Sequence, residues 1–160
     1  EGMGRAITIV VGGARESLDA QPGTIRLVLK GRKGFIKMAL RTGADLVPVL
    51  GFGENDLYDQ IESNGYPIIH RLQLFVKREL GFTIPLFHAR GVFNYHAGLM
   101  PYRRPINIVV GRPIKVKQSL NPQPEEVDRV HNEYIQELER IWTTWKNKAA
   151  PYRKEEMLYI

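Results

Sequence analysis

Basic side chains gather at the start of one predicted helix, where they could bind an anionic group. Arg32 and Lys33 precede Gly34, and Lys37 follows one helical turn later. The free N–H groups and the dipole of a helix N-terminus favour an anion, and an arginine can grip a phosphate with two parallel hydrogen bonds. A solvated basic turn is the simpler interpretation, and on the evidence of this cluster alone we prefer it.

Two further polar residues follow predicted strands. Glu54 lies beyond the apolar run 46–50, and His88 lies beyond the run 82–87. Ligands of α/β proteins bind beyond the carboxyl ends of parallel strands, so Glu54 could orient a polar substrate group. A helix cap or a surface charge explains Glu54 equally well. His88 could act as a base, but we prefer a hydrogen-bonded structural histidine.

Several common active-site patterns are absent from the sequence. No Walker A pattern follows Gly12 and Gly13, and no Gly-x-Ser-x-Gly elbow occurs. The four histidines lack His-x-x-x-His spacing, and the chain has no cysteine. We therefore expect neither a metal site nor thiolate chemistry.

The composition is that of one globular domain with a basic surface. The chain has 160 residues, of which 43% are hydrophobic, and 23 Lys and Arg against 17 Asp and Glu give a net charge of +6. This charge suits nucleic acid, acidic lipid headgroups or phosphorylated small molecules. The basic residues are spread along the chain without a nucleic-acid-binding signature, so we expect no nucleic acid partner. No apolar run approaches the ~18 residues that span a bilayer.

Strand-like and helix-like runs alternate along the chain. We expect strands over residues 5–11, 25–29, 46–50, 82–87 and 106–110, and helices from Gly34 to a C-cap at Gly43 and over residues 66–80. Pro48 cannot donate to a strand ladder, which predicts an edge, a bulge or a strand end there. The alternation predicts a βαβ unit with parallel strands. Residues 90–105 form a long irregular connection of possible functional importance.

The last predicted helix has the clearest signals. Proline residues and negative charges mark its start near Pro124, and Pro151 ends it. An apolar stripe at helical spacing predicts that one face packs on the sheet: Val127, Val130, Tyr134, Leu138, Ile141 and Trp145. The stripe of the 66–80 helix could lie in a membrane interface, although we favour packing on the core.

Residues 32–55, RKGFIKMALRTGADLVPVLGFGEN, resemble the signature of the type-2 diacylglycerol acyltransferase family. The family pattern has Arg-x-Gly-Phe, a basic residue, Ala, Gly, Val-Pro and Phe-Gly-Glu-Asn. The matching positions are Arg32, Gly34, Phe35, Lys37, Ala39, Gly43, Val47, Pro48, Phe52, Gly53, Glu54 and Asn55. A glycine pair with a following glutamate, at Gly12, Gly13 and Glu16, is similar to another family block, and the resemblance extends over residues 5–148.

The resemblance implies an α/β fold, a partial glycerolipid-acyltransferase-like domain. We expect a mixed, mostly parallel sheet flanked by helices, with a long C-terminal amphipathic helix. Residues 1–150 would be the C-terminal part of one acyltransferase domain and residues 151–160 a C-terminal tail. One departure matters: the family's His-Pro-His-Gly motif, which carries the presumed catalytic histidine, is missing. That motif lies upstream of the glycine pair in the family, so we expect no catalytic residue in this chain and no activity from it alone.

The resemblance further implies transfer of a fatty acyl group from acyl-CoA to diacylglycerol, which forms triacylglycerol. Acyl-CoA would be a co-substrate, and no cofactor is expected. Monoacylglycerol or a long-chain alcohol is the alternative acceptor, and a basic module that binds anionic membrane or nucleic acid is the non-enzymatic alternative. The family context predicts the cytosolic face of the endoplasmic reticulum membrane or a lipid droplet surface, and leaves a homo-oligomer open.

Site residues follow from the matched positions. Gly12 and Gly13 would allow close backbone approach, and Arg32, Lys33 and Lys37 would meet CoA phosphates or lipid headgroups. Glu16, Glu54 and Asn55 would order the acceptor side. The other substrate-binding candidates are Gly34, Phe35, Pro48, Phe52, Gly53, His88 and Arg90.

Overall fold

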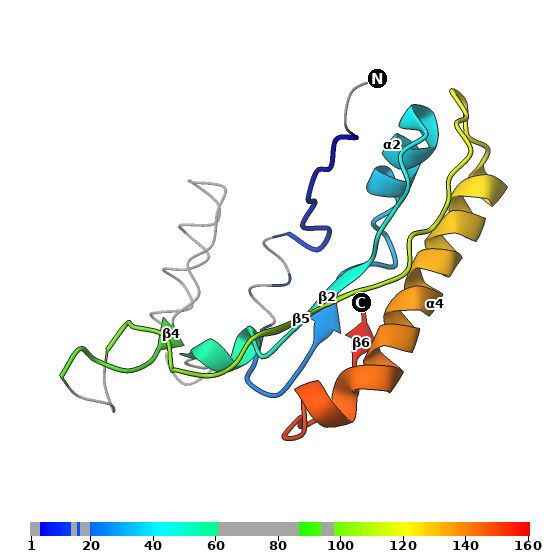
Figure 1. Ribbon diagram of the computed structural model, residues 1–160. Helices are drawn as coiled ribbons and strands as arrows, with labels where there is room; N and C mark the ends of the chain where they lie inside the picture. Colours follow the sequence, from blue (N-terminus) through cyan, green and yellow to red (C-terminus); the bar gives the residue numbers. More distant parts are fainter. Residues whose placement is uncertain (1–3, 14–15, 17–19, 61–86, 94–97) are drawn as a thin grey trace, which may run out of the picture.

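The structure is a computed structural model, which describes residues 4–13, 16, 20–60, 87–93 and 98–160 (Figure 1). Short strands alternate with two longer helices along the chain. The elements are β1 (Arg26–Leu27), α2 (Gly34–Thr42), β2 (Val49–Phe52), the 3₁₀ helix η1 (Asn55–Leu57), β3 (Asp59–Gln60), β4 (Phe87–His88), β5 (Asn107–Val110), α4 (Pro124–Ala149) and β6 (Leu158–Tyr159). This mixture of helices and small sheets agrees with the expected α/β class.

Helix α4 packs against both α2 and β2. Proline at its start needs no N–H partner, Glu125 and Glu126 face the positive end of its dipole, and Lys146 and Lys148 face the negative end. In Figure 1, α4 runs along one side of the molecule, beside α2 and the β2–β5 pair. The predicted long C-terminal helix is therefore present, and of the two prolines that the sequence offers as start signals, Pro122 and Pro124, it begins at the second.

The N-terminal half of α4 packs against α2. The buried residues of this contact are Ile36, Leu40, Val127 and Val130. Helix α2 ends at Gly43, whose φ of 69° is left-handed and whose N–H donates to the carbonyl of Ala39. Glycine adopts this conformation without steric cost, so the predicted C-cap is confirmed.

The C-terminal half of α4 covers one face of the β2–β5 pair. The strands are antiparallel, with Leu50 opposite Val109. Leu50 and Phe52 point to α4, where Phe52 stacks on Trp142 with ring centroids 5.9 Å apart. Pro48 is buried directly before β2, so it marks a strand end as predicted, and its carbonyl accepts from the N–H of Gly111 at 2.8 Å.

The last residues of the chain return to the core. Strand β6 pairs in parallel with β1, and Met157 is buried in the cluster that contains Leu29 and Trp142. The N–H of Ile160 donates to Leu27, and the carbonyl of Ile160 accepts from Leu29 and Lys30. Residues 157–160 therefore close one edge of β1.

The strand pairing differs from the expectation. Parallel pairing is present for β1 and β6, but β2–β5 and β3–β4 are antiparallel, so the sheets of the described residues are not mostly parallel. The strands on either side of α2 lie in different sheets, so the predicted βαβ unit is wrong. Each strand obtains its partner from far along the chain, which local patterns do not specify.

The predicted first strand is also wrong. Residues 4–10 are not in a strand and are exposed, whereas their β-branched run predicts a buried one. A buried strand needs both a ladder partner and cover on both faces, and residues 5–10 have neither among the described residues. The predicted 66–80 helix and most of the predicted 82–87 strand lie outside the described residues. No helix in the described ranges combines the length and hydrophobicity needed to cross a membrane.

Candidate functional site

A cavity of about 1230 Å³ lies between the N-terminal segment, β1, β2 and the C-terminal half of α4. Its apolar lining comes from both sides, with Val11, Ile25 and Leu27 opposite Leu138 and Trp142. The cavity brings together several of the predicted site residues, although they are distant in sequence. These are Gly12, Gly13, Glu16, Gly53, Glu54 and Asn55.

Glu16 is the best-defined acidic group of the cavity. Its Oε1 accepts a hydrogen bond of 2.7 Å from the N–H of Val28, which ties the N-terminal segment to β1. Burial raises the pKa of Glu16, the negative charge of Glu54 raises it further, and the Val28 hydrogen bond and the charge of Arg32 oppose these effects. The net result is a carboxyl whose pKa lies above its ordinary value.

Gly12 is required by the position of Glu16. A Cβ added to Gly12 would clash with the carboxyl group of Glu16, so another residue fits only if the Glu16 side chain moves. Gly13 has a φ of 64°, in the left-handed region that favours glycine. Gly12 therefore leaves room for the glutamate of the same block. The close approach of these glycines to a substrate stays a prediction.

Tyr134 lines the cavity, whereas the sequence predicts only that it packs in the core as part of the apolar stripe. Burial raises the pKa of its hydroxyl, and the charge of Glu16 raises it further, so the phenol is neutral at pH 7 and can donate a hydrogen bond. Its ring also meets Phe35 edge-on, with centroids 5.0 Å apart. The signal for this dual role was a polar tip within an otherwise apolar helical stripe.

The Gly53–Asp56 loop is held against the turn before β1. The side-chain amide of Asn55 donates to the carbonyl of Thr24 at 2.8 Å, and Asp56 accepts from the N–H of Gly23 at 2.7 Å. Gly53 has a φ of 87°, and a Cβ there would lie 2.4 Å from the carbonyl oxygen of Pro105. These contacts shape one wall of the cavity. The sequence reasoning missed Asp56, which directly follows the matched Phe-Gly-Glu-Asn block.

The predicted anion-binding cluster lies outside the cavity lining. Lys33 forms an ion pair of 2.6 Å with Asp128, near the start of α4. Arg32 and Lys37 are exposed, and Gly34 begins α2. Arg32 is close enough to Glu16 to lower the pKa of that carboxyl, so it is the member of the cluster nearest to the cavity chemistry.

The remaining predicted site residues lie in the core or in the β3–β4 region. Pro48 and Phe52 are buried, which makes packing their observed role. His88 pairs with Asp59 across the β3–β4 ladder. The Nε of Arg90 donates to the carbonyl of Pro101 at 2.9 Å, and the backbone of Arg90 pairs with that of Met100.

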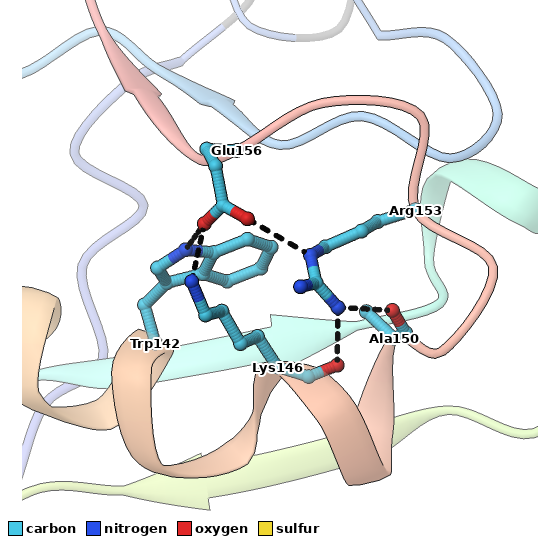
Figure 2. A network of polar contacts seen from close by, with 5 residues as sticks. All are labelled: Trp142, Lys146, Ala150, Arg153 and Glu156. Carbon is cyan, nitrogen blue, oxygen red and sulfur yellow. Dashed lines mark hydrogen bonds and ion pairs between the residues drawn. The ribbon is translucent and has the colours of Figure 1, made fainter.

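Basic residues from the end of α4 and the segment after it are part of the cavity lining, and we call them the cavity mouth. These are Lys148, Arg153 and Lys154, and Arg104 approaches from the segment before β5. Figure 2 shows how Arg153 is held: its Nε pairs with Glu156 at 3.2 Å, and its guanidinium also donates to the carbonyls of Lys146 and Ala150. This positive mouth suits a ligand that carries phosphate or carboxylate groups.

Glu156 is the centre of this network and was not predicted. Its Oε2 accepts from Lys146 and from the indole N–H of Trp142, both at 2.7 Å (Figure 2). These contacts, with that of Arg153, lower the pKa of Glu156 to about 2. The carboxylate thereby fixes both the α4 end and the arginine at the cavity mouth.

The described cavity lining contains no histidine. His131 is buried on α4, where its Nε2 lies 3.0 Å from the carbonyl of Leu29, so it has a structural partner. Across the described ranges, no three carboxylate or imidazole groups lie close enough to hold a metal ion. The arrangement is an apolar cavity with a protonatable carboxyl, a neutral phenol and a cationic mouth.

The structure by itself shows an α/β arrangement with a cavity that apolar and basic side chains line. Comparison with known sequences is more specific. The model of the family described as "Diacylglycerol acyltransferase" matches residues 1–159, and the chain belongs to this family.

Similar proteins carry acylglycerol acyltransferase names. The chain is 46% identical to 2-acylglycerol O-acyltransferase 1 of Bos taurus, over 99% of this chain and 48% of that protein. It is 48% identical to diacylglycerol O-acyltransferase 2A of Umbelopsis ramanniana, over 99% of this chain and 45% of that protein. It is 47% identical to diacylglycerol O-acyltransferase 1 of Schizosaccharomyces pombe, over 96% of this chain and 45% of that protein. The chain therefore spans just under half the length of these relatives. No solved structure matches it.

Proposed function

We propose that this chain is part of an acyltransferase that moves a fatty acyl group from acyl-CoA to diacylglycerol and forms triacylglycerol. The family match over residues 1–159 carries the proposal. The cavity supports it, because an apolar interior suits an acyl chain and a cationic mouth suits the phosphates of CoA. We place the reaction at the cytosolic face of the endoplasmic reticulum membrane or at a lipid droplet, where both substrates meet.

The proposed chemistry is an ester exchange. The acceptor hydroxyl oxygen bonds to the thioester carbonyl carbon, the carbon–sulfur bond breaks, and the hydroxyl proton passes through a base to the leaving CoA thiolate. An alcohol attacks a thioester poorly unless a positioned base removes its proton. The family resemblance assigns this base to the His-Pro-His-Gly histidine, which this sequence lacks, so this chain alone is expected to be inactive. Its own residues would bind and orient the substrates.

Two lysines in different parts of the structure are candidates for the contact with the phosphates of CoA. Lys154 lines the cavity mouth, whereas Lys37 belongs to the matched signature on α2. In the active protein that contains this chain, we expect Lys154→Ala to raise the apparent KM for acyl-CoA several-fold with little change in kcat. Lys115→Ala is the matched control, because Lys115 is exposed and pairs with Asp45 away from the cavity. A higher KM in Lys37→Ala, with Lys154→Ala unchanged, would place the phosphates at α2 instead.

The choice of acceptor is tested by product analysis. Membranes that contain the active protein are supplied with labelled oleoyl-CoA and with diacylglycerol, monoacylglycerol or a long-chain alcohol. Labelled triacylglycerol as the main product supports the proposal. Because a similar protein from Bos taurus is named a 2-acylglycerol acyltransferase, monoacylglycerol is the second candidate acceptor, and labelled diacylglycerol as the main product would favour it. No release of CoA with any acceptor would refute both.

A further inference from the structure

The face of the β2–β5 pair that points away from α4 is apolar and exposed, and no element among the described residues packs on it. Opposite residues in a ladder share a face, so the pairs Val49–Val110 and Gly51–Ile108 define this outer face. The alternation continues into the residues just before each strand, Val47 and Ile106. The five apolar side chains are between 43% and 69% exposed: Val47, Val49, Ile106, Ile108 and Val110.

This exposure is unusual for a sheet whose inner face is already packed. On the inner face, Leu50 and Phe52 of β2 are buried against α4, and Val109 of β5 is partly buried in the same cluster. Strands that are apolar on both faces are typical of sheets covered on both sides. A Cβ added to Gly51 would meet nothing closer than Glu54, at 3.9 Å, so the centre of the outer face is open. An uncovered group of apolar side chains of this kind marks an interaction site.

We propose that the outer face of β2–β5 binds the half of the family's acyltransferase polypeptide that this chain does not span. In the three relatives described above, more than half of the polypeptide lies outside the matched part and needs a surface on which to pack. This inference uses the family assignment and does not depend on the proposed reaction. The backbone groups at the edges of the two strands also favour a polypeptide as the binding partner.

The backbone argument concerns the edges of the pair. Within the part of the chain that the structure describes, β2 and β5 each pair with one strand, so the N–H and carbonyl groups of the other edge of each strand have no described partner strand. Lipid hydrocarbon cannot satisfy these groups, whereas further strands or loops of a polypeptide can. A bilayer is therefore a poorer occupant, although the side chains alone would suit it.

The outer face adjoins the cavity, so a polypeptide that binds to this face would also contact the cavity. Val49 and Gly51 belong both to the outer face and to the cavity lining. A segment that covers the outer face therefore also reaches the cavity lining, and it can complete the cavity wall at Val49 and Gly51. Groups on that segment would face the same cavity as Tyr134.

Co-expression of two polypeptides tests the inference. The tagged 160-residue chain is produced together with the part of the Bos taurus relative that it does not match, and the complex is recovered in mild detergent. We expect the second polypeptide to co-purify with the wild-type chain, and recovery to fall about ten-fold for Ile108→Asp. Leu120→Asp is the matched control, because Leu120 is 76% exposed and lies outside the face, and we expect it to bind like the wild type.

Three further measurements separate the alternatives. Circular dichroism checks that each variant is folded, and Val110→Thr provides a milder, isosteric variant that should bind two-fold to five-fold less. Self-association of the chain alone, abolished by Ile108→Asp without capture of the second polypeptide, would overturn the inference in favour of a second copy. Flotation of the chain with phosphatidylcholine–phosphatidylinositol vesicles, lost in Ile108→Asp without such capture, would overturn it in favour of a membrane. Equal capture by wild type and Ile108→Asp, or capture by neither, would also overturn it.

Discussion

At the scale of single residues, Gly12 and Glu16 form one structural unit. The glycine leaves room for the carboxylate, and the carboxylate accepts the N–H of Val28. We expect Gly12→Ala to displace Glu16 and break this hydrogen bond, which costs about 1–2 kcal/mol of unfolding free energy. Urea denaturation of the chain measures the loss.

A double-mutant cycle tests whether Gly12→Ala lowers the unfolding free energy because it displaces Glu16. In a Glu16→Ala background the clash is relieved, so a further Gly12→Ala should cost little. Gly31→Ala is the control, since a Cβ at Gly31 meets nothing within 4 Å. Additive effects of Gly12→Ala and Glu16→Ala would contradict the proposed unit.

Glu156 gives a second prediction at this scale, for the dependence of stability on pH. Its partners, Lys146 first, then Trp142 and Arg153, lower its folded-state pKa from 4.5 to about 2. A depressed carboxyl pKa stabilises the folded state above the unfolded value, and this contribution is lost as the pH falls from about 4.5 towards 2. Glu156→Gln should therefore show a shallower fall of unfolding free energy in this window.

The comparison must isolate Glu156 from a second carboxylate. Contacts with Arg140 and the N–H of Arg112 lower the pKa of Glu137 to about 2 as well, so the wild-type fall has more than one source. The measured quantity is the difference between wild type and Glu156→Gln in urea unfolding from pH 6 to pH 2.5. Parallel curves over that range would show that the Glu156 network contributes nothing.

At the scale of elements, the two tryptophans of α4 have different roles. The helical spacing predicts Trp145 in the buried stripe, but the structure buries Trp142, which is 6% exposed against 36% for Trp145. Trp142 stacks on Phe52 and donates to Glu156, whereas the Trp145 ring lies 5.4 Å from the Lys148 ammonium. Both residues lie near the edge of the apolar stripe. Contacts with β2 and with the end of the chain therefore determine which of the two rings is buried.

This assignment predicts a large difference between two substitutions. Trp142→Ala removes a buried ring and its hydrogen bond, and should cost about 3–5 kcal/mol. Trp145→Ala removes a partly exposed ring, and should cost less than about 1 kcal/mol. Unfolding free energies from urea titrations compare them, and equal losses would show that the stripe includes both rings.

The same elements show what the sequence could predict. Helix α2, its cap at Gly43 and the start of α4 follow from local signals, because spacing, a left-handed glycine and a proline act within a few residues. The sequence also marked Gly12, Glu16 and Asn55, which the cavity brings together. Strand partners could not be predicted, since residues distant in sequence form them only after folding. The Glu156 network lies within residues 142–156, but it depends on how the chain turns back after α4, which no local pattern specifies.

At the scale of the whole molecule, α4 joins two hydrophobic clusters that depend on different parts of the chain. One cluster contains Ile36 and Val130, from α2 and the first half of α4. The other contains Leu50, Trp142 and Met157, so it needs the last residues of the chain. The two halves of α4 should therefore differ in how they respond to damage at the C-terminus.

A truncation that removes residues 156–160 tests this dependence. It deletes Met157, the carboxylate of Glu156 and the backbone bonds of Ile160 to β1. We expect hydrogen exchange to accelerate at least ten-fold in β1 and in the second half of α4, while α2 and the first half of α4 keep most of their protection. Tyr152→Ala is the control in the same segment, because Tyr152 is exposed and its loss should leave exchange unchanged. An equal loss of hydrogen-exchange protection in α2 would mean that the two clusters unfold as one unit. In that case, no part of α4 stays folded without residues 156–160.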